Sequence, residues 1–456
     1  MASLLPEKFV ERMSLDLGDA EGRALCEALL SDAPVSVRLN PRKRGAHPEG
    51  EPIGWSRCGI RLAERPVFTL DTAFHAGRYY VQEAGSQFVG HILETTGTGD
   101  GRILDMCAAP GGKTTLYSAL VGEKGLVVAN DPVRNRASVL ADNVRKWGIG
   151  NVVVACDEPQ HIAVFENRFD VVAVDAPCSG EGMFRKDERA REEWSENNVR
   201  MCAARQLQIL DSAWHALRPS GVLIYSTCTF NRTENEGVLR EFSARVGGEL
   251  AEAECIACDD AWGVVAGREG VFQTFRFYPH RACAEGFFVA VARKAASDGR
   301  AVVPKPRRRI MNDVAGAVRK ELSRWVLHPE NMRFADVGGT CYGYYADTYD
   351  EVRSFAETVN VIYSGVAMGV VYNGKLKPDA ALAMFVDLNE NAVPVAELER
   401  EEALRYLRKQ DIAASAFAEG VNLVKSGGCA LGFVKRIGNR CNNMYPNSLR
   451  ILKTDL

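Results

Sequence analysis

The sequence lacks any apolar run long enough to cross a membrane, and it lacks a large excess of either charge. Crossing a bilayer takes about 20 consecutive apolar residues, and every apolar stretch of this 456-residue chain is shorter. Residues 1–16 mix charged with apolar side chains, unlike a secretory signal peptide. A net charge of −3 excludes a general attraction to nucleic acid, so any such site must be a local patch. We therefore expect a cytoplasmic protein without a membrane segment.

The 13 cysteines should be mostly reduced in that compartment. A reduced cysteine without a special environment behaves as a small apolar residue and is usually buried. This is our interpretation of six of them: Cys26, Cys58, Cys156, Cys202, Cys341 and Cys429.

The chain is long enough for two or three domains, each with its own core. Residues 1–95 have the pattern of a small α/β module, whereas residues 96–295 alternate strand and helix patterns as parallel βαβ units do. A basic linker with two prolines follows at 296–310. We expect an intermediate α+β region at 311–390 and a basic β module at 391–456. The aromatic residues of this last module suit RNA binding, and an exposed basic hairpin without a partner is the alternative.

Four elements are expected beyond the linker. The residue patterns predict helices over 312–327 and 394–410. They predict a β-rich stretch over 361–387 around the hairpin signal Asn373-Gly374. Two further strands should flank Ser426-Gly-Gly428 in the tail.

A glycine-rich loop over residues 107–113 is the main candidate ligand-binding feature of the chain. The apolar run Ile103-Leu104-Asp105 leads into a glycine-rich turn, and a helix-like segment follows at 114–121. Strand, tight loop and helix start in this order hold anionic or adenosine-containing ligands in α/β sheets. The turn is close to the phosphate-binding motif G-x-x-x-x-G-K-[ST], but Cys107 stands where that motif needs its first glycine. The candidate ligand-binding residues are Cys107, Ala108, Ala109, Pro110, Gly111, Gly112 and Lys113.

An aspartate follows each of three predicted strands. Asp131, Asp157 and Asp175 come directly after the strands expected near 126–130, 151–156 and 169–174. Ligands of open α/β sheets lie beyond these carboxyl ends. One such aspartate alone is best explained as a helix N-cap. Three in register, downstream of a glycine-rich loop, favour an adenosine ligand whose ribose and adenine they can contact.

Two cysteines differ from the others in position. Cys178 follows the strand that ends before Asp175, and Cys228 follows the next strand, expected over 222–226. Neighbouring parallel strands would bring both thiols to the ligand edge of the sheet, in a polar setting where a thiolate can be functional. Such a thiolate can add to carbon 6 of a cytosine, which makes carbon 5 able to accept a methyl group. Asp175 could serve N3 of the base. The residues alone do not decide which thiol is the nucleophile.

These motifs resemble the Nol/Nop/Sun RNA 5-methylcytosine methyltransferases. The motifs are Asp105-Met-Cys-Ala-Ala-Pro-Gly-Gly-Lys113, Asp175-Ala-Pro-Cys-Ser-Gly180, Tyr225-Ser-Thr-Cys-Thr229, Pro279-His-Arg281 and Tyr79-Tyr-Val-Gln-Glu83. The end of the chain, with Leu431-Gly-Phe-Val-Lys-Arg436 and Asn443-Met-Tyr-Pro446, is similar to the bacterial RsmF group, which methylates a cytosine in the decoding region of 16S ribosomal RNA. The resemblance implies a Rossmann-like class I methyltransferase core, with a doubly wound, mostly parallel sheet. It also implies a PUA-like RNA-binding module at 391–456.

The resemblance also implies roles for individual residues. Cys228 would be the nucleophile, and Cys178 would aid product release. Asp175 and Lys113 would line the catalytic site, and the loop over 107–113 would hold the cofactor S-adenosylmethionine. Asp175 would contact both this methyl donor and the target base. In that cofactor site Asp131 would bind the ribose, and Asp157 would lie at the adenine. Arg185-Lys186 could contact the RNA backbone.

The partner implied is RNA, either 16S ribosomal RNA or the small ribosomal subunit. We expect no DNA substrate, no membrane and a monomer. Three alternatives remain: a transfer-RNA cytosine methyltransferase, a noncatalytic RNA-binding or ribosome-assembly factor, and a P-loop NTPase.

A zinc site is suggested only by cysteine spacing. Cys255-x-x-Cys258 and His280-x-x-Cys283 are spaced as zinc ligands often are. His280, however, lies in the Pro279-His-Arg281 motif of the family, and the intervening residues have a strand pattern of their own. We therefore expect no metal.

Overall fold

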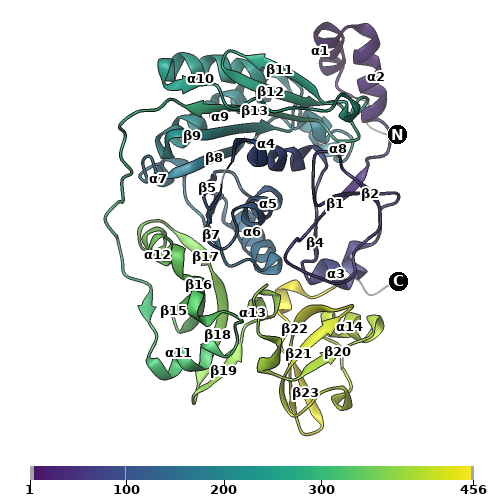
Figure 1. Ribbon diagram of the computed structural model, residues 1–456. Coiled ribbons are helices and arrows are strands. Elements are labelled where there is room, and N and C mark those ends of the chain that lie inside the picture. The colour runs from purple at the N-terminus through teal and green to yellow at the C-terminus, as the bar shows by residue number, and fades with distance from the viewer. Residues whose placement is uncertain (1–4, 98, 453–456) are drawn as a thin grey trace.

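Figure 1 shows the computed structural model, which describes residues 5–97 and 99–452. The chain begins with a helix pair, α1 (Glu7–Leu17) and α2 (Asp19–Leu29). The pair buries Phe9 against Phe184 and Phe230 of the central domain. A small antiparallel sheet follows in the order β2-β3-β1-β4. Its strands are β1 (Val35–Leu39), β2 (Glu51–Pro52), β3 (Gly59–Leu62) and β4 (Tyr79–Val81).

The central domain has the alternating strands and helices that the sequence predicts. Its parallel strands are β5 (Arg102–Asp105), β6 (Leu126–Asn130), β7 (Val152–Ala155), β8 (Phe169–Asp175) and β9 (Leu217–Thr227). They are ordered β7-β6-β5-β8-β9, and the antiparallel strands β13 (Phe287–Lys294), β12 (Phe272–Phe277) and β11 (Val265–Glu269) continue the sheet beyond β9. The chain order reverses between β5 and β8, so the carboxyl ends of these strands meet at a switch point where ligands bind.

Helices cover both faces of this sheet because its strands are apolar on both sides. Ile103 and Val127 pack in one core, beneath α4 (Phe88–Thr96), α5 (Gly112–Val121) and α6 (Arg134–Trp147). Leu104 and Val128 point into the other core, beneath α9 (Glu196–Ala216) and α10 (Val238–Val246). This alternation along each strand is the period-two pattern of a doubly covered sheet.

The central sheet gains a strand from beyond the linker. β17 (Val361–Ser364) pairs antiparallel with β7, next to α12 (Tyr349–Thr358), and so covers the edge that β7 would otherwise expose. Tyr363 of β17 is 4% exposed and lies in the core beneath α6. In Figure 1 this green segment lies against the lower end of the central sheet. The intermediate region is therefore built into the central sheet through β17.

Two predicted helices beyond the linker are wrong in part. Only Gly316–Ser323 of the stretch 312–327 is helical, because Asn312–Asp313 pairs as a strand with a neighbouring strand of the intermediate sheet. Only Arg400–Leu407 of the stretch 394–410 is helical, because Val395–Glu397 adds as a parallel strand to the tail sheet. Local periodicity could not show these pairings, since both are made with distant residues.

The other predictions for this half are confirmed in outline. The Asn373-Gly374 turn joins two antiparallel strands, and both residues have positive φ. The β-rich stretch ends earlier than expected, in a short helix from Ala380. Strands flank Ser426-Gly-Gly428 as expected. The remaining elements are α3 (Thr72–His75), α7 (Pro159–Ile162), α8 (Glu188–Glu193), β10 (Leu250–Ala251), β14 (Asn312–Asp313), α11 (Gly316–Ser323), β15 (Met332–Val337), β16 (Thr340–Tyr345), β18 (Val366–Tyr372), β19 (Lys375–Pro378), α13 (Ala380–Met384), β20 (Val395–Glu397), α14 (Arg400–Leu407), β21 (Gly420–Ser426), β22 (Cys429–Ile437) and β23 (Arg440–Asn443).

Within residues 5–97 and 99–452, no helix combines the length and apolar character that a bilayer span requires.

Candidate active site

The loop after β5 turns tightly into α5. Gly111 has a φ of +110°, a left-handed conformation that glycine favours, and an added Cβ there would lie 3.0 Å from Leu140. The backbone N–H of Ala108 donates to the carbonyl of Asn130 at 2.8 Å, which holds the loop against the end of β6. The loop therefore presents the start of α5 to the carboxyl edge of the sheet.

A cavity of about 180 Å³ opens beside this loop. Most of the predicted loop residues line this cavity. Other residues, for which the sequence predicts no individual role, line it as well. The predicted residues are Cys107, Ala108, Ala109, Pro110, Gly112, Lys113 and Asp175, and the others are Tyr80, Val81, Gln82, Glu83, Ser86 and Asp105.

Asp105 carries an unused acceptor into this cavity. Its Oδ2 accepts a hydrogen bond from Thr114 at 2.7 Å, whereas its buried Oδ1 has no hydrogen-bond partner in the described part of the chain. Burial, together with the nearby Asp175, raises the pKa of the Asp105 carboxyl to about 7, against the lowering effect of the hydrogen bond from Thr114. A buried oxygen of this kind calls for a donor, and a cationic ligand group would supply one. S-adenosylmethionine carries an ammonium and a sulfonium group, so the residues present fit it.

Lys113 connects the loop to the end of β8. Its Nζ lies 2.8 Å from Oδ2 of Asp175, and it also lies 4.9 Å from the ring centroid of Phe287. The other oxygen of Asp175 accepts a hydrogen bond from the Ser226 hydroxyl at 2.7 Å. Both oxygens of Asp175 are thus held, and its carboxylate faces an ammonium at the edge of the cavity.

The two selected thiols lie together. Sγ of Cys178 and Sγ of Cys228 are 3.1 Å apart, which confirms the proximity expected from the strand order. The cause is register: Asp175 of β8 pairs with Ser226 of β9, and Cys178 and Cys228 lie three and two residues beyond these paired positions. The hydrogen bond with Cys228, and then burial, raise the pKa of the Cys178 thiol well above its usual value. Cys178 therefore keeps its proton while Cys228 stands beside it.

The two remaining aspartates do not line this cavity. Asp131 accepts from the backbone N–H of Val133 at 3.0 Å and pairs with Arg136 at 3.2 Å. Asp157 accepts from His161 at 2.5 Å and from the backbone N–H of Asn360 at 3.1 Å. Burial alone would raise the pKa of Asp157, but these hydrogen bonds outweigh it and lower the pKa. Both carboxylates are held at the carboxyl ends of β6 and β7. This is the edge of the sheet beside the glycine-rich loop, where the sequence predicts them.

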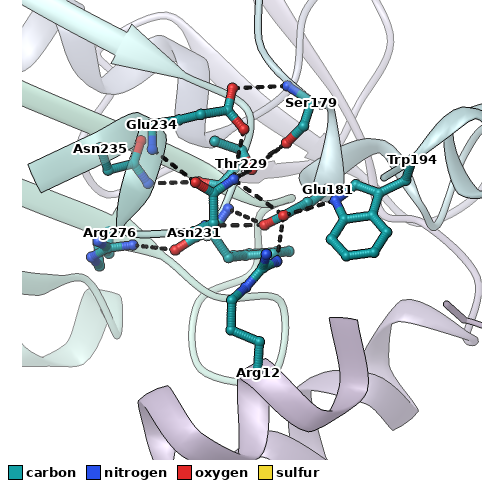
Figure 2. A network of polar contacts seen from close by, with 10 residues as sticks. Arg12, Ser179, Glu181, Trp194, Thr229, Asn231, Glu234, Asn235 and Arg276 are labelled. Atoms are coloured by element: carbon teal, nitrogen blue, oxygen red, sulfur yellow. Dashed lines mark hydrogen bonds and ion pairs between the residues drawn. The ribbon is translucent and has the colours of Figure 1, made fainter. Parts of the chain in front are cut away.

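A buried polar network lies behind the two cysteine loops, which carry Cys178 after β8 and Cys228 after β9. No motif of the sequence predicts this network. Figure 2 shows the network, in which side chains from the loops after β8 and β9 meet a side chain of α1. Its centre is the pair Glu181 and Asn231, whose hydrogen bond joins residues 50 positions apart in sequence. A glutamate among glycines gives no local signal of such a role. Its labelled members are Arg12, Ser179, Glu181, Trp194, Thr229, Asn231, Glu234, Asn235 and Arg276.

Partners within the protein hold three further residues named in the sequence analysis: Arg185, Lys186 and His280. Arg185 pairs with Glu285 at 3.1 Å, and Lys186 lies 3.5 Å from the same carboxylate. Both cations are therefore paired with a carboxylate of the protein. His280 donates from Nε2 to the carboxylate of Glu21 in α2, at 2.8 Å. Within residues 5–97 and 99–452, no three potential metal ligands are gathered.

Of the six cysteines expected to be buried, only two are. Cys341 and Cys429 are buried, whereas the other four are half-buried because they lie on outer faces or at the ends of their elements: Cys26, Cys58, Cys156 and Cys202.

The strand order, the glycine turn after the first parallel strand and the carboxylates at its edge define a class I S-adenosylmethionine-dependent methyltransferase. Comparisons with known proteins agree. Residues 93–293 match the model of the 16S rRNA methyltransferase RsmB/F, residues 5–84 match the N-terminal domain of 16S rRNA methyltransferase RsmF, and residues 393–451 match the RsmF PUA domain. The chain belongs to this RsmB/RsmF methyltransferase family, as the resemblance implied.

Individual relatives cover most of the chain. A ribosomal RNA small subunit methyltransferase F of Escherichia coli is 32% identical over 87% of this chain and 84% of its own length. The protein of the same name from Cronobacter sakazakii is 31% identical over 98% of this chain and 96% of its own length. Among solved structures, a methyltransferase homologue from Pyrococcus horikoshii shares 25% identity and a TM-score of 0.53, over 63% of this chain and 95% of that chain. The protein is thus an S-adenosylmethionine-dependent RNA methyltransferase.

Proposed function

We propose that this enzyme methylates carbon 5 of a cytosine in the decoding region of 16S ribosomal RNA, through a covalent bond between Cys228 and carbon 6 of the base. The observation that carries the proposal is the pair of thiols 3.1 Å apart beside the carboxylate of Asp175. Methylation of a base nitrogen or of a ribose hydroxyl needs neither thiol. The names of the full-length relatives support the choice of 16S ribosomal RNA.

The chain supplies each step with a residue. The Cys228 thiolate adds to carbon 6, and the electron pair of the ring double bond moves toward N3. N3 takes a proton delivered from the Lys113 ammonium through Asp175, with which Lys113 is paired, and returns that proton by the same route when the ring is restored. When bound, S-adenosylmethionine supplies the methyl group to carbon 5. A base then removes the proton from carbon 5, the double bond re-forms, and Cys228 leaves as the thiolate.

The pKa of Cys178 suits it to this last step. The main cause that raises its pKa is the hydrogen bond with Cys228. Once Cys228 is bonded to carbon, that hydrogen bond is lost and the pKa of Cys178 falls, although burial still raises it. Cys178 then becomes able to take the carbon 5 proton, at the stage where release requires a base.

We further propose the residue assignments for the cofactor. The loop over 107–113 would hold S-adenosylmethionine, Asp131 would bind its ribose, Asp157 would lie at the adenine, and Asp105 would accept from a cationic group. The proposed division is an N-terminal module over 1–95, a catalytic domain over 96–295, a linker over 296–310, an intermediate region over 311–390 and an RNA-binding module over 391–456. The three family matches support the first, second and last of these parts. A monomer acting in the cytoplasm, on free RNA or on the small subunit, completes the proposal.

Two cysteine variants test the chemistry. Cys228→Ala should abolish methylation, whereas Cys178→Ala should accumulate a protein–RNA adduct that survives denaturing electrophoresis. Cys26→Ala, which changes a half-buried cysteine of α2, is the matched control and should behave as wild type. Methylation by Cys228→Ala at the wild-type rate would contradict the mechanism. Bisulfite mapping of 16S ribosomal RNA and of transfer RNA from a deletion strain decides between the two substrates.

A further inference from the structure

Glu181 is a fully buried carboxylate that ties the Cys178 loop to the Cys228 loop. It lies three positions after Cys178, and its Oε2 accepts hydrogen bonds from the backbone N–H groups of Phe230 and Asn231, both at 3.0 Å. These two residues lie two and three positions after Cys228 in the next loop. One oxygen of Glu181 therefore fixes the backbone that carries the other thiol.

The second oxygen of Glu181 reaches the N-terminal helix pair. Oε1 accepts from Nδ2 of Asn231 at 3.1 Å and from the indole N–H of Trp194 at 3.0 Å, and it pairs with the guanidinium of Arg12 from α1. The same guanidinium lies 5.2 Å from a ring centroid of Trp194. Figure 2 shows Arg12 rising from the purple helix α1 to end at Glu181.

A second carboxylate completes the link. Oε2 of Glu234 accepts from the backbone N–H of Ser179 at 2.9 Å, next to Cys178, and its Oε1 accepts from Asn231 at 2.6 Å. Nδ2 of Asn231 therefore donates toward both carboxylates, between the two loops.

The charge of this network depends on Arg12. A buried carboxylate that loses its counter-charge is strongly destabilised, because its neighbours cannot replace the lost hydration. In the part of the chain that the structure describes, Arg12 is the only cationic side chain paired with Glu181. Its side chain is 24% exposed whereas that of Glu181 is fully buried, so α1 closes the network from outside.

We propose that Glu181 and Arg12 are positioning residues that hold the Cys178 and Cys228 thiols at their working separation, so that the N-terminal helix α1 takes part in setting the catalytic geometry. Neither side chain lines the cofactor cavity. Their effect on methylation is therefore exerted through the two loops. The kinetic part of this inference rests on the proposed role of the thiols.

The test compares Glu181→Gln, Arg12→Ala and Arg12→Lys with a control from the same helix, Lys8→Ala. Lys8 pairs with Glu196 at 2.8 Å on the surface, so its removal breaks an α1 ion pair that touches neither loop. Each variant is measured for kcat, for the dissociation constant of S-adenosylmethionine by calorimetry, and for the rate at which diamide couples the two thiols. In that coupling the thiols lose two electrons and two protons to the nitrogen–nitrogen double bond of diamide, and peptide mass spectrometry reports the Cys178–Cys228 disulfide.

Glu181→Gln should lower kcat about 100-fold, the cost expected when a reacting group is displaced by about 1 Å. Arg12→Ala should lower it in the same direction, and Arg12→Lys should restore part of the loss because it returns the charge. In Glu181→Gln and Arg12→Ala the rate of disulfide formation should fall, while cofactor affinity stays at the wild-type value. Lys8→Ala should match wild type in every measurement.

Wild-type kcat and wild-type disulfide formation in a folded Arg12→Ala or Glu181→Gln protein would overturn the proposal. A loss of cofactor affinity equal to the loss of kcat would also overturn it, because that would show general loosening of the domain. If Glu181→Gln does not fold, the Arg12 variants carry the test. Disulfide formation needs no methyl transfer, so it still reports the thiol spacing if Cys228→Ala proves active and the proposed chemistry fails.

Discussion

Replacement of Gly182 by alanine should separate the two cysteine loops by steric contact alone. The backbone N–H of Gly182 donates to the carbonyl of Cys228 at 2.8 Å, so the loops touch through their main chains at this point. A Cβ on Gly182 would lie 2.3 Å from the carbonyl oxygen of Gly286 and 2.9 Å from that of Cys228. Both obstacles are backbone atoms, which cannot rotate away as a flexible side chain can.

The size of the effect follows from these distances. Ordinary contact begins near 3.4 Å, so the carbonyl of Gly286 must move away by about 1 Å and that of Cys228 by about 0.5 Å. A displacement of about 1 Å costs about 100-fold in rate when it affects a reacting group, so half of that displacement at Cys228 should cost about 10-fold. Forcing a methyl group into a packed site should also lower the free energy of unfolding by about 1–3 kcal/mol. Gly182 has no positive φ, so the strain comes from contact and not from the backbone preference of alanine.

The assay is single-turnover methylation, with thermal unfolding measured in parallel. Gly316→Ala is the matched control, because a Cβ at Gly316 meets nothing within 4 Å. Cofactor affinity should be unchanged in both variants, since neither glycine lines the cavity beside residues 107–113. A Gly182→Ala enzyme with the wild-type rate and melting temperature would refute the claim that these loops are held at backbone contact.

Two further predictions concern the cofactor cavity and the sheet edge. Because burial raises the pKa of Asp105 to about 7, its carboxyl is mostly neutral below that pH, and affinity for S-adenosylmethionine should rise from about pH 6 to about pH 7.5 as the carboxylate forms. Asp105→Asn should flatten this rise in calorimetric titrations, and a rise of the same size in the variant would exclude Asp105 as its source. Tyr363→Ala should lower the free energy of unfolding in urea by about 3–5 kcal/mol, because it removes a buried aromatic ring that joins β17 to the central core. A loss below about 1 kcal/mol, the size expected at a surface position, would show that β17 adds little to the sheet.

The central sheet could be predicted from sequence because most of its parallel strands are continuous apolar runs with an acid at or just beyond the end. The strand predicted near 126–130 has those bounds in the structure, as β6. The strand order then placed the two thiols together, although their residues are 50 positions apart. Neighbouring parallel strands bring their carboxyl ends to the same edge of a sheet, and this rule was enough to predict that the two cysteine motifs lie close together.

The rest depends on contacts between distant residues that leave no local pattern. Asn312–Asp313 looks like the start of a helix until its partner strand is known. The importance of Glu181 becomes visible only with Arg12, 169 residues earlier in the chain. The open acceptor of Asp105 arises from burial, which no single sequence displays. Long-range pairing and desolvation are the two kinds of information that periodicity and motifs do not contain.

The strand β17 also determines when the catalytic sheet can be completed during synthesis. Translation releases the N-terminal end first, so β7 emerges long before Ser364, the last residue of β17. Until then the outer edge of β7 offers free N–H and C=O groups to any other extended chain. The nascent enzyme therefore passes through a stage in which its catalytic motifs are all present while one side of its sheet remains open. A fragment ending in the linker over 296–310 would keep that edge exposed permanently, and it should associate with itself more readily than the full chain.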